Sequence, residues 1–166
     1  MNKRLIIERE DLSLEKEIKG MLTKMRGQLA KFPKKGPKQV EAIFSLRAEI
    51  YEDLNQLQHK ALIIAAAKRL AKRYPTISKW KWHPKQTSSI NEADLTGYSR
   101  DKIVINAEVT TSNRPIGTID QRMKRTLLSL SKKKGTLFYF VRTNEMLSRA
   151  KHKITRNGWS INCEKI

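Results

Sequence analysis

The sequence predicts an α/β domain in which helices flank a β-sheet, preceded by a helical N-terminal extension. Two long segments in the N-terminal half carry apolar residues at helical spacing. After Pro75 three short segments alternate apolar with polar residues, as strands do. From about residue 118 onward, helical and strand-like segments alternate. Together these patterns predict the order helix, helix, three strands, helix, strand, helix, strand.

The N-terminal half is predicted to form two helices. The first covers residues 14–32, with Ser13 as its cap, and the Pro-Lys-Lys-Gly-Pro-Lys segment at 33–38 ends it. The second covers residues 39–74 and ends before Pro75. One buried stripe is expected along the second helix, made of Ile43, Leu46, Ile50, Leu54, Leu57, Ala61 and Ile64.

The middle of the chain is predicted to form strands at residues 79–82, 93–98 and 103–110, with a turn at 97–101. In the third strand the alternation is clear, because side chains at every second position share a face. One face carries Ile103, Ile105, Ala107 and Val109, and the other carries Val104, Asn106, Glu108 and Thr110.

The C-terminal part is predicted to form a helix that Gly135 ends, a strand at 136–142, a helix at 144–156 and a strand at 159–163. The first of these helices has a buried stripe made of Ile119, Met123, Thr126, Leu127 and Leu130. We therefore divide the chain into a helical arm, residues 1–37, and a core, residues 38–166. The arm is expected to pack on the core, to mediate dimerisation, or to contact a partner or DNA.

The composition predicts a polyanionic partner. The 166 residues include 35 Lys or Arg and 16 Asp or Glu, which gives a formal net charge of +19. Such a surplus attracts nucleic acid. An acidic membrane surface is the competing partner, but no stretch approaches the ~20 apolar residues of a spanning helix. The single cysteine, Cys163, and the lack of an apolar signal segment predict a cytoplasmic protein.

Two carboxylates are the candidate centre of chemistry. Asp94 and Glu108 lie on consecutive predicted strands, and antiparallel pairing would bring them together. A close pair of carboxylates suits Mg²⁺, which prefers oxygen ligands and keeps several waters. The alternative is that both are ordinary acids on the surface of a sheet.

The segments Glu92-Ala93-Asp94-Leu95 and Ile105-Asn106-Ala107-Glu108-Val109-Thr110, with the hairpin between them, resemble the PD-(D/E)xK nuclease superfamily. The resemblance implies a restriction-endonuclease-like fold with a mixed sheet over about residues 38–166. It also implies a DNA endonuclease of restriction type that uses Mg²⁺, for which Mn²⁺ can substitute. The metal ligands implied are Asp94, Glu108 and the carbonyl of Val109, with Glu49 of the preceding helix as a third carboxylate.

The chain departs from the family pattern where the lysine two residues after the second acid is replaced by Thr110 and the proline before the first acid by Ala93. The resulting Glu-Val-Thr is similar to the pattern of certain type IIS and nicking endonucleases. Lys102 and Lys124 are candidates for a displaced base, and ordinary phosphate contact is the alternative for both. Gln121 resembles the helix glutamine of the RecB-like branch, although Arg125 replaces its tyrosine.

A basic region is expected to contact the nucleic acid. Residues 119–156 contain eleven Lys or Arg and two acids. Neutralised phosphates would make binding strongly salt-dependent, and a merely solvated basic face is the alternative. The expected contacts are Lys102, Gln121, Arg122, Lys124, Arg125, Lys132, Lys133 and Lys134.

The sequence thus predicts a Mg²⁺-dependent DNA endonuclease, with a homodimer expected if both strands of a duplex are cut. Thr110 keeps open a second possibility, a nucleic-acid-binding protein without catalysis. In a third possibility, the protein is a nuclease subunit whose arm binds a larger partner that recognises the target.

Overall fold

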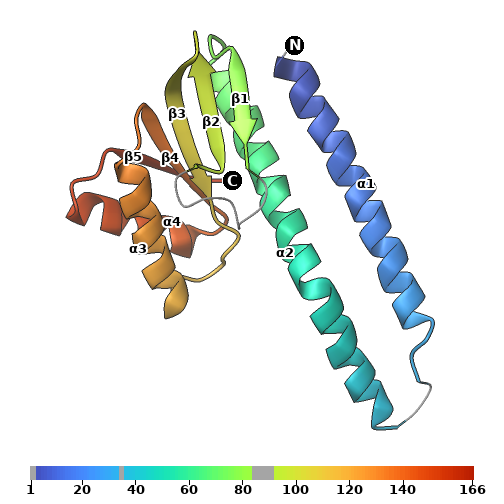
Figure 1. The fold of residues 1–166 in the computed structure, drawn as a ribbon. Helices are drawn as coiled ribbons and strands as arrows, with labels where there is room; N and C mark the ends of the chain where they lie inside the picture. Colours follow the sequence, from blue (N-terminus) through green and yellow to red (C-terminus); the bar gives the residue numbers. More distant parts are fainter. Residues whose placement is uncertain (1–2, 34–35, 84–91) are drawn as a thin grey trace.

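The computed structural model describes residues 3–33, 36–83 and 92–166. A hairpin of two long helices stands beside a sheet that carries two shorter helices (Figure 1). The elements, in chain order, are α1 (Lys3–Leu29), α2 (Lys38–Arg73), β1 (Lys79–Trp82), β2 (Leu95–Ser99), β3 (Lys102–Val109), α3 (Thr118–Ser131), β4 (Thr136–Val141), α4 (Asn144–Arg156) and β5 (Ile161–Lys165). The predicted order of elements is therefore confirmed.

The five described strands form one mixed sheet in the order β1-β2-β3-β4-β5. β1, β2 and β3 pair antiparallel, whereas β3, β4 and β5 run parallel. The parallel connections pass through α3 and α4, as parallel neighbours require. The α/β class predicted from the sequence is confirmed.

The sheet is covered on both faces, by α2 on one and by α3 and α4 on the other (Figure 1). Alternate residues of β4 divide between the two layers. Phe138 and Phe140 pack with the apolar residues of α2, while Tyr139 packs with those of α3 and α4. The central strands are therefore buried on both sides. The polar Thr96 and Asn106 inside them are satisfied by a hydrogen bond from the Thr96 hydroxyl to the Asn106 side-chain oxygen.

The β2–β3 hairpin turns at Arg100 and Asp101, which have φ angles of 48° and 60°. Two consecutive positive φ angles are typical of the two-residue turn that matches the twist of an antiparallel pair. The predicted turn was wrong in starting at Gly97, which lies inside β2 and is buried. A Cβ on Gly97 would lie 3.0 Å from both Ile77 Cδ1 and Trp80 Cζ3, so a side chain there requires these two neighbours to move.

The first helix begins at Lys3 and not at residue 14, so the prediction of Ser13 as its cap was wrong. Ser13 lies within α1, where its hydroxyl donates to Glu17 and accepts from Lys60 of α2. Polar contacts between the two helices thus account for the serine. β5 also differs from its prediction, because two residues follow the Gly158 turn before Ile161 pairs with Leu137.

The single buried stripe predicted for α2 was also wrong in part. Ile50 and Ile64 are buried, but Ile43 and Leu54 are exposed. The reason is that α2 has two environments along its length. Its C-terminal half packs against the sheet, whereas its N-terminal half contacts only α1 among the described elements. None of the described helices has an apolar stretch long enough to span a bilayer.

Gly97→Val is expected to lower the free energy of unfolding by about 1–3 kcal/mol, because the new side chain enters the filled space beside Ile77 and Trp80. Urea denaturation measures the change. The matched control is Gly20→Val on α1, where nothing lies within 4 Å of the new Cβ. A loss of stability no larger than that of the control would contradict the packing described here.

Candidate functional site

The register of the hairpin sets Asp94 opposite Glu108. Leu95 pairs with Ala107, so the residue before Leu95 faces the residue after Ala107. The Val109 backbone N–H donates a 2.8 Å hydrogen bond to Asp94 Oδ2 and so extends the pairing by one step. The convergence expected from the sequence is therefore present in the structure.

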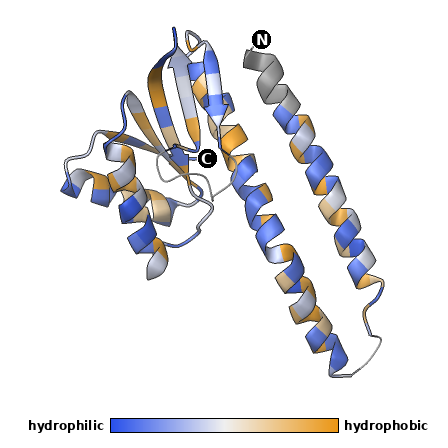
Figure 2. Cartoon of the chain, in the orientation of Figure 1, coloured by the Kyte–Doolittle hydropathy of each residue, from blue (hydrophilic) through white to orange (hydrophobic). Residues whose placement is uncertain are grey.

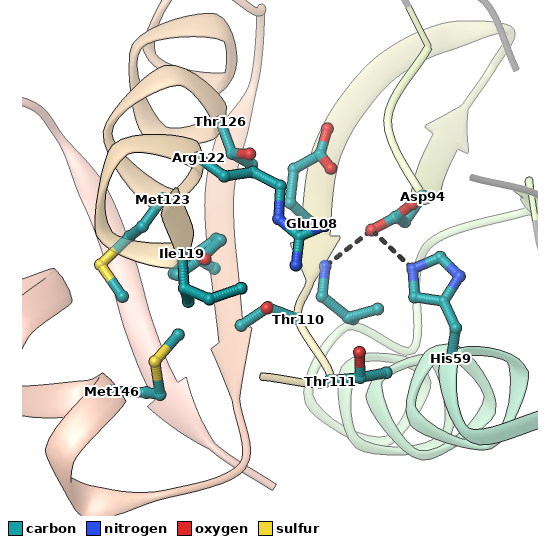
Figure 3. Close-up of a pocket in the computed structure, with 12 residues that line it drawn as sticks. His59, Asp94, Glu108, Thr110, Thr111, Ile119, Arg122, Met123, Thr126 and Met146 are labelled. Carbon is teal, nitrogen blue, oxygen red and sulfur yellow. Dashed lines mark hydrogen bonds and ion pairs between the residues drawn. The ribbon is translucent and has the colours of Figure 1, made fainter. Parts of the chain in front are cut away.

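Asp94 and Glu108 line a cavity of about 250 Å³ at this end of the sheet. Figure 3 shows Arg122 entering from α3 on one side and His59 from α2 on the other. The remaining lining residues are Val109, Thr110, Thr111, Ile119, Met123, Thr126, Tyr139 and Met146. The cavity thus collects side chains from both helical layers around two carboxylates that the strands supply.

His59 holds Asp94 from the α2 side. Its side chain is buried, and Nε2 lies 3.4 Å from Asp94 Oδ2, the oxygen that also accepts from Val109. Two groups from different elements therefore orient one carboxylate. Sequence reasoning gave His59 no role. It is spaced four residues before buried Ile63 and so shares the side of α2 that faces the core, but only the fold shows that this side meets Asp94.

Burial and the neighbouring Asp94 carboxylate raise the pKa of Glu108 to about 8. Burial disfavours the charged form, and a second negative charge beside it adds to that effect. Lys133 acts in the opposite direction and lowers the pKa of Glu108. Two carboxylates in this setting favour a bound cation, which would offset both charges.

The oxygen atoms at the site fit Mg²⁺. Two carboxylates and the Val109 carbonyl are hard donors, and Mg²⁺ completes its six positions with water. Among the described residues no group of three or more His, Cys, Asp or Glu side chains is arranged to hold a metal. An ion here would accordingly be held by a carboxylate pair with a backbone oxygen and solvent.

Thr110, which occupies the position of the lysine in the PD-(D/E)xK pattern, lines the cavity. Its backbone N–H donates to the Phe140 carbonyl, which ties the end of β3 to β4. Burial raises the pKa of Tyr139, which lies across from Glu108 on β4, and a hydrogen bond with Thr110 partly offsets that rise. Tyr139 therefore stays neutral, and Thr110 offers a hydroxyl but no charge.

Glu49 is not brought to this site. Its carboxylate accepts a 2.7 Å hydrogen bond from Gln28 of α1. It also lies ten residues before His59 on the same helix, which corresponds to about 15 Å. The predicted third carboxylate was thus misplaced, because the side of α2 near Ile50 faces α1 and not the sheet.

Neither lysine predicted as a displaced base lines the cavity. Lys102 begins β3, six residues and about 20 Å from Glu108. Lys124 is exposed on α3, one residue after the buried Met123, and points away from the sheet. Lys133, half-buried after α3, is close enough for its charge to lower the pKa of Glu108. Tertiary packing brings it close although it lies far along the chain.

The remaining predicted nucleic-acid contacts lie on the surface of α3 and just beyond it. Arg122 reaches the cavity and donates to the Ser112 hydroxyl. Exposed on the same helix, or in the segment after it, are Gln121, Arg125, Lys132 and Lys134. Of these residues only Arg122 lines the cavity that holds the carboxylates, and Arg125, Lys132 and Lys134 are exposed cations elsewhere on α3 or after it.

Part of the basic region is neutralised within the fold. Asp120 accepts from Arg149 at 2.8 Å and from Lys153 at 2.9 Å. The hydrogen bond from Arg149 above all holds the pKa of Asp120 well below its ordinary range. Lys153 is itself buried, so this cluster joins α3 to α4 and reduces the charge available to a nucleic acid.

No protein-family model, curated protein or solved structure matches the chain.

In metal-free buffer, the wild-type protein is expected to lose stability as the pH rises. Glu108→Gln is expected to abolish this pH-dependent loss. The pKa of Glu108 is raised from 4.5 to about 8, so the folded state keeps a proton that the unfolded state releases. This contribution to stability is fully present below about pH 4.5 and is lost as the pH rises through about 8. Urea denaturation in EDTA across this interval measures it.

The matched control is Glu52→Gln, which removes an exposed carboxylate from α2. It should keep the wild-type pH dependence. An identical pH dependence in the wild-type and Glu108→Gln proteins would contradict the burial of Glu108.

Proposed function

We propose that this protein is a Mg²⁺-dependent endonuclease that hydrolyses phosphodiester bonds in DNA. The observation that carries the proposal is the meeting of Asp94 and Glu108 in one cavity, where burial and mutual repulsion raise the pKa of Glu108 to about 8. A carboxylate pair in a partly buried cavity lowers the stability of the fold when both groups are charged, so a functional role explains it better than a structural one.

The topology also supports the proposal. A helix is followed by three antiparallel strands, a helix and a parallel strand, which is the core order of the restriction-endonuclease-like nucleases that the motif resembles. Asp94 comes just before β2, and Glu108 lies at the end of β3. We therefore propose that the core has the restriction-endonuclease-like fold and that the activity is of restriction type.

Asp94, Glu108 and the Val109 carbonyl would hold the metal, with His59 keeping the Asp94 carboxylate in place. Bound Mg²⁺ would supply positive charge to a phosphate oxygen and lower the pKa of a coordinated water. Arg122 at the cavity edge can bind a second phosphate oxygen. The Thr110 hydroxyl can hold a water or a phosphate oxygen by hydrogen bonding, but it cannot supply the charge of a lysine.

The reaction is hydrolysis. The oxygen of water bonds to phosphorus, one phosphorus–oxygen ester bond breaks, and a proton goes to the departing alkoxide. The products are a phosphate monoester and an alcohol, and no oxidant or reductant takes part.

DNA as the substrate is supported by charge. A net charge of +19 attracts a polyanion, Arg122 lines the same cavity as the carboxylate pair, and Lys133 acts electrostatically on Glu108. Without such cations two carboxylates would repel a phosphate backbone. The basic residues therefore allow the substrate to approach the acids.

With purified protein and supercoiled plasmid, Mg²⁺ or Mn²⁺ is expected to support cleavage and EDTA to abolish it. Asp94→Asn and Glu108→Gln should each lower the initial rate by at least about 100-fold, because each replaces a negatively charged carboxylate ligand of the metal with a neutral amide. The matched controls are Asp101→Asn in the hairpin turn and Glu52→Gln on α2, both exposed and away from the cavity. Each control should cut at the wild-type rate.

Salt-sensitive DNA binding without cleavage under either metal would overturn the nuclease assignment and favour a non-catalytic binding protein, the reading that Thr110 supports. Cleavage that survives in both cavity variants would place the active site elsewhere. Cleavage that appears only when a recognition protein is added would favour the partner-dependent subunit.

His59→Ala is expected to raise the Mg²⁺ concentration that gives half-maximal cleavage by about 10–100-fold, because the Asp94 carboxylate loses a group that orients it. Cleavage rates over a Mg²⁺ titration measure this positioning role. Exposed His152→Ala is the matched control. A fall in maximal rate with an unchanged Mg²⁺ requirement would show that His59 does not position a metal ligand.

A further inference from the structure

Large apolar side chains are exposed along the hairpin of α1 and α2. Phe44 is 62% exposed and Tyr51 58%, values that are unusual for residues of this size. Figure 2 shows the corresponding hydrophobic segments recurring along the part of α2 that extends away from the sheet. We call this set the arm face: Ile18, Leu22, Leu29, Val40, Ile43, Phe44, Tyr51 and Leu54.

The residues of the arm face form a stripe on each helix. At about 100° per residue, the five on α2 fall within an arc of about 100°, and the three on α1 fall within about 40°. Leu12, also exposed on α1, lies about 100° from the centre of its arc, and the exposed Arg47 lies within the arc on α2. Each helix therefore presents an apolar strip to solvent, which Arg47 interrupts on α2.

The two strips lie on the same side of the hairpin. Ion pairs from Lys24 to Asp53 and from Lys60 to Glu17 mark the line where α1 and α2 meet, and they show that the helices are antiparallel. Each residue lies about 100° further around the helix axis than the one before it. Counted in this direction from the line of ion pairs, the centre of the apolar strip lies about 130° around the axis on both helices. Because the helices run in opposite directions, these two rotations end on the same side.

The sheet cannot cover the arm face. The residues with which α2 contacts the sheet, such as Ile63 and Leu70, lie about 90° from the same line in the opposite rotational direction. The α/β part of the molecule therefore packs on one side of the hairpin, and the arm face occupies the other.

The net charge around the arm face favours contact with another protein surface over contact with a polyanion. Residues 18–54, the span of the arm face, contain eight Lys or Arg and four Asp or Glu, a surplus of four, whereas residues 119–156 carry a surplus of nine. A nucleic acid or an anionic membrane would therefore be attracted more strongly to the region of α3 and α4. The lower charge of the arm face favours contact with another protein surface.

The size of the arm face also suits a dimer. The strip on α2 runs for about 20 Å from residue 40 to 54 and that on α1 for about 17 Å from residue 18 to 29, at 1.5 Å per residue. Including flanking side chains over helices about 10 Å wide, the face covers on the order of 500 Å² or more. Stable interfaces bury about 800 Å² per partner, so the face would supply most of the apolar centre of such a contact.

We propose that the arm face is a self-association surface, on which a second copy of this chain packs its own arm to form a four-helix bundle. A two-fold axis would place the same apolar strips on both partners, as closed dimers require. The bundle would bury these strips as its core, in the way that antiparallel helical hairpins pack. This inference does not depend on the nuclease assignment.

Sedimentation equilibrium of the full chain, without DNA or metal, tests the proposal. The wild-type protein is expected to be a dimer at micromolar concentration. Phe44→Lys combined with Tyr51→Lys should weaken the dimer by at least about 100-fold, because two apolar side chains at the centre of the interface become charged.

The matched control is Ser45→Lys combined with Glu52→Gln, which adds the same charge at exposed positions on another side of the same helix. This variant should remain dimeric. Circular dichroism checks that all variants keep their helix content, and Leu54→Lys serves as a milder substitution of the arm face. A wild-type monomer across the concentration range, or equal dissociation of the arm-face and control variants, would overturn the proposal.

Discussion

The antiparallel pairing of β2 with β3 is the constraint on which the candidate site depends. Two residues with positive φ close the hairpin, and the register that follows sets Asp94 opposite Glu108. The hydrogen bond from the Val109 N–H to Asp94 then holds the first carboxylate where β2 begins. A shift of one residue in this register would turn one of the two carboxylates to the opposite face of the sheet.

The site owes its chemistry to its position between two layers. The apolar residues of α2 cover one face of β3, and α3 and α4 cover the other, so Glu108 projects into a partly enclosed cavity lined by both polar and apolar side chains. Burial and the nearby Asp94 make its charged form unfavourable. A cation that binds both carboxylates relieves this cost, and the same ion is what phosphodiester hydrolysis requires.

α2 links the candidate site to the helical hairpin that carries the arm face. Its C-terminal half packs under the sheet and carries His59 to Asp94, while its N-terminal half pairs with α1 outside the α/β layers. A helix of 36 residues can serve both purposes because it is about 54 Å long. If two arms associate, their α2 helices would connect the dimer contact directly to both candidate sites.

The sequence by itself determined the order of the elements and the meeting of Asp94 with Glu108. Helical and strand periods are local properties, and a short hairpin brings together residues that are close along the chain. The tertiary structure decided which side of each helix is covered. It turned Glu49 toward α1, brought His59 to Asp94, kept Lys102 and Lys124 out of the cavity, and left Phe44 and Ile43 exposed. These outcomes depend on packing between segments far apart in the chain, which no local period encodes.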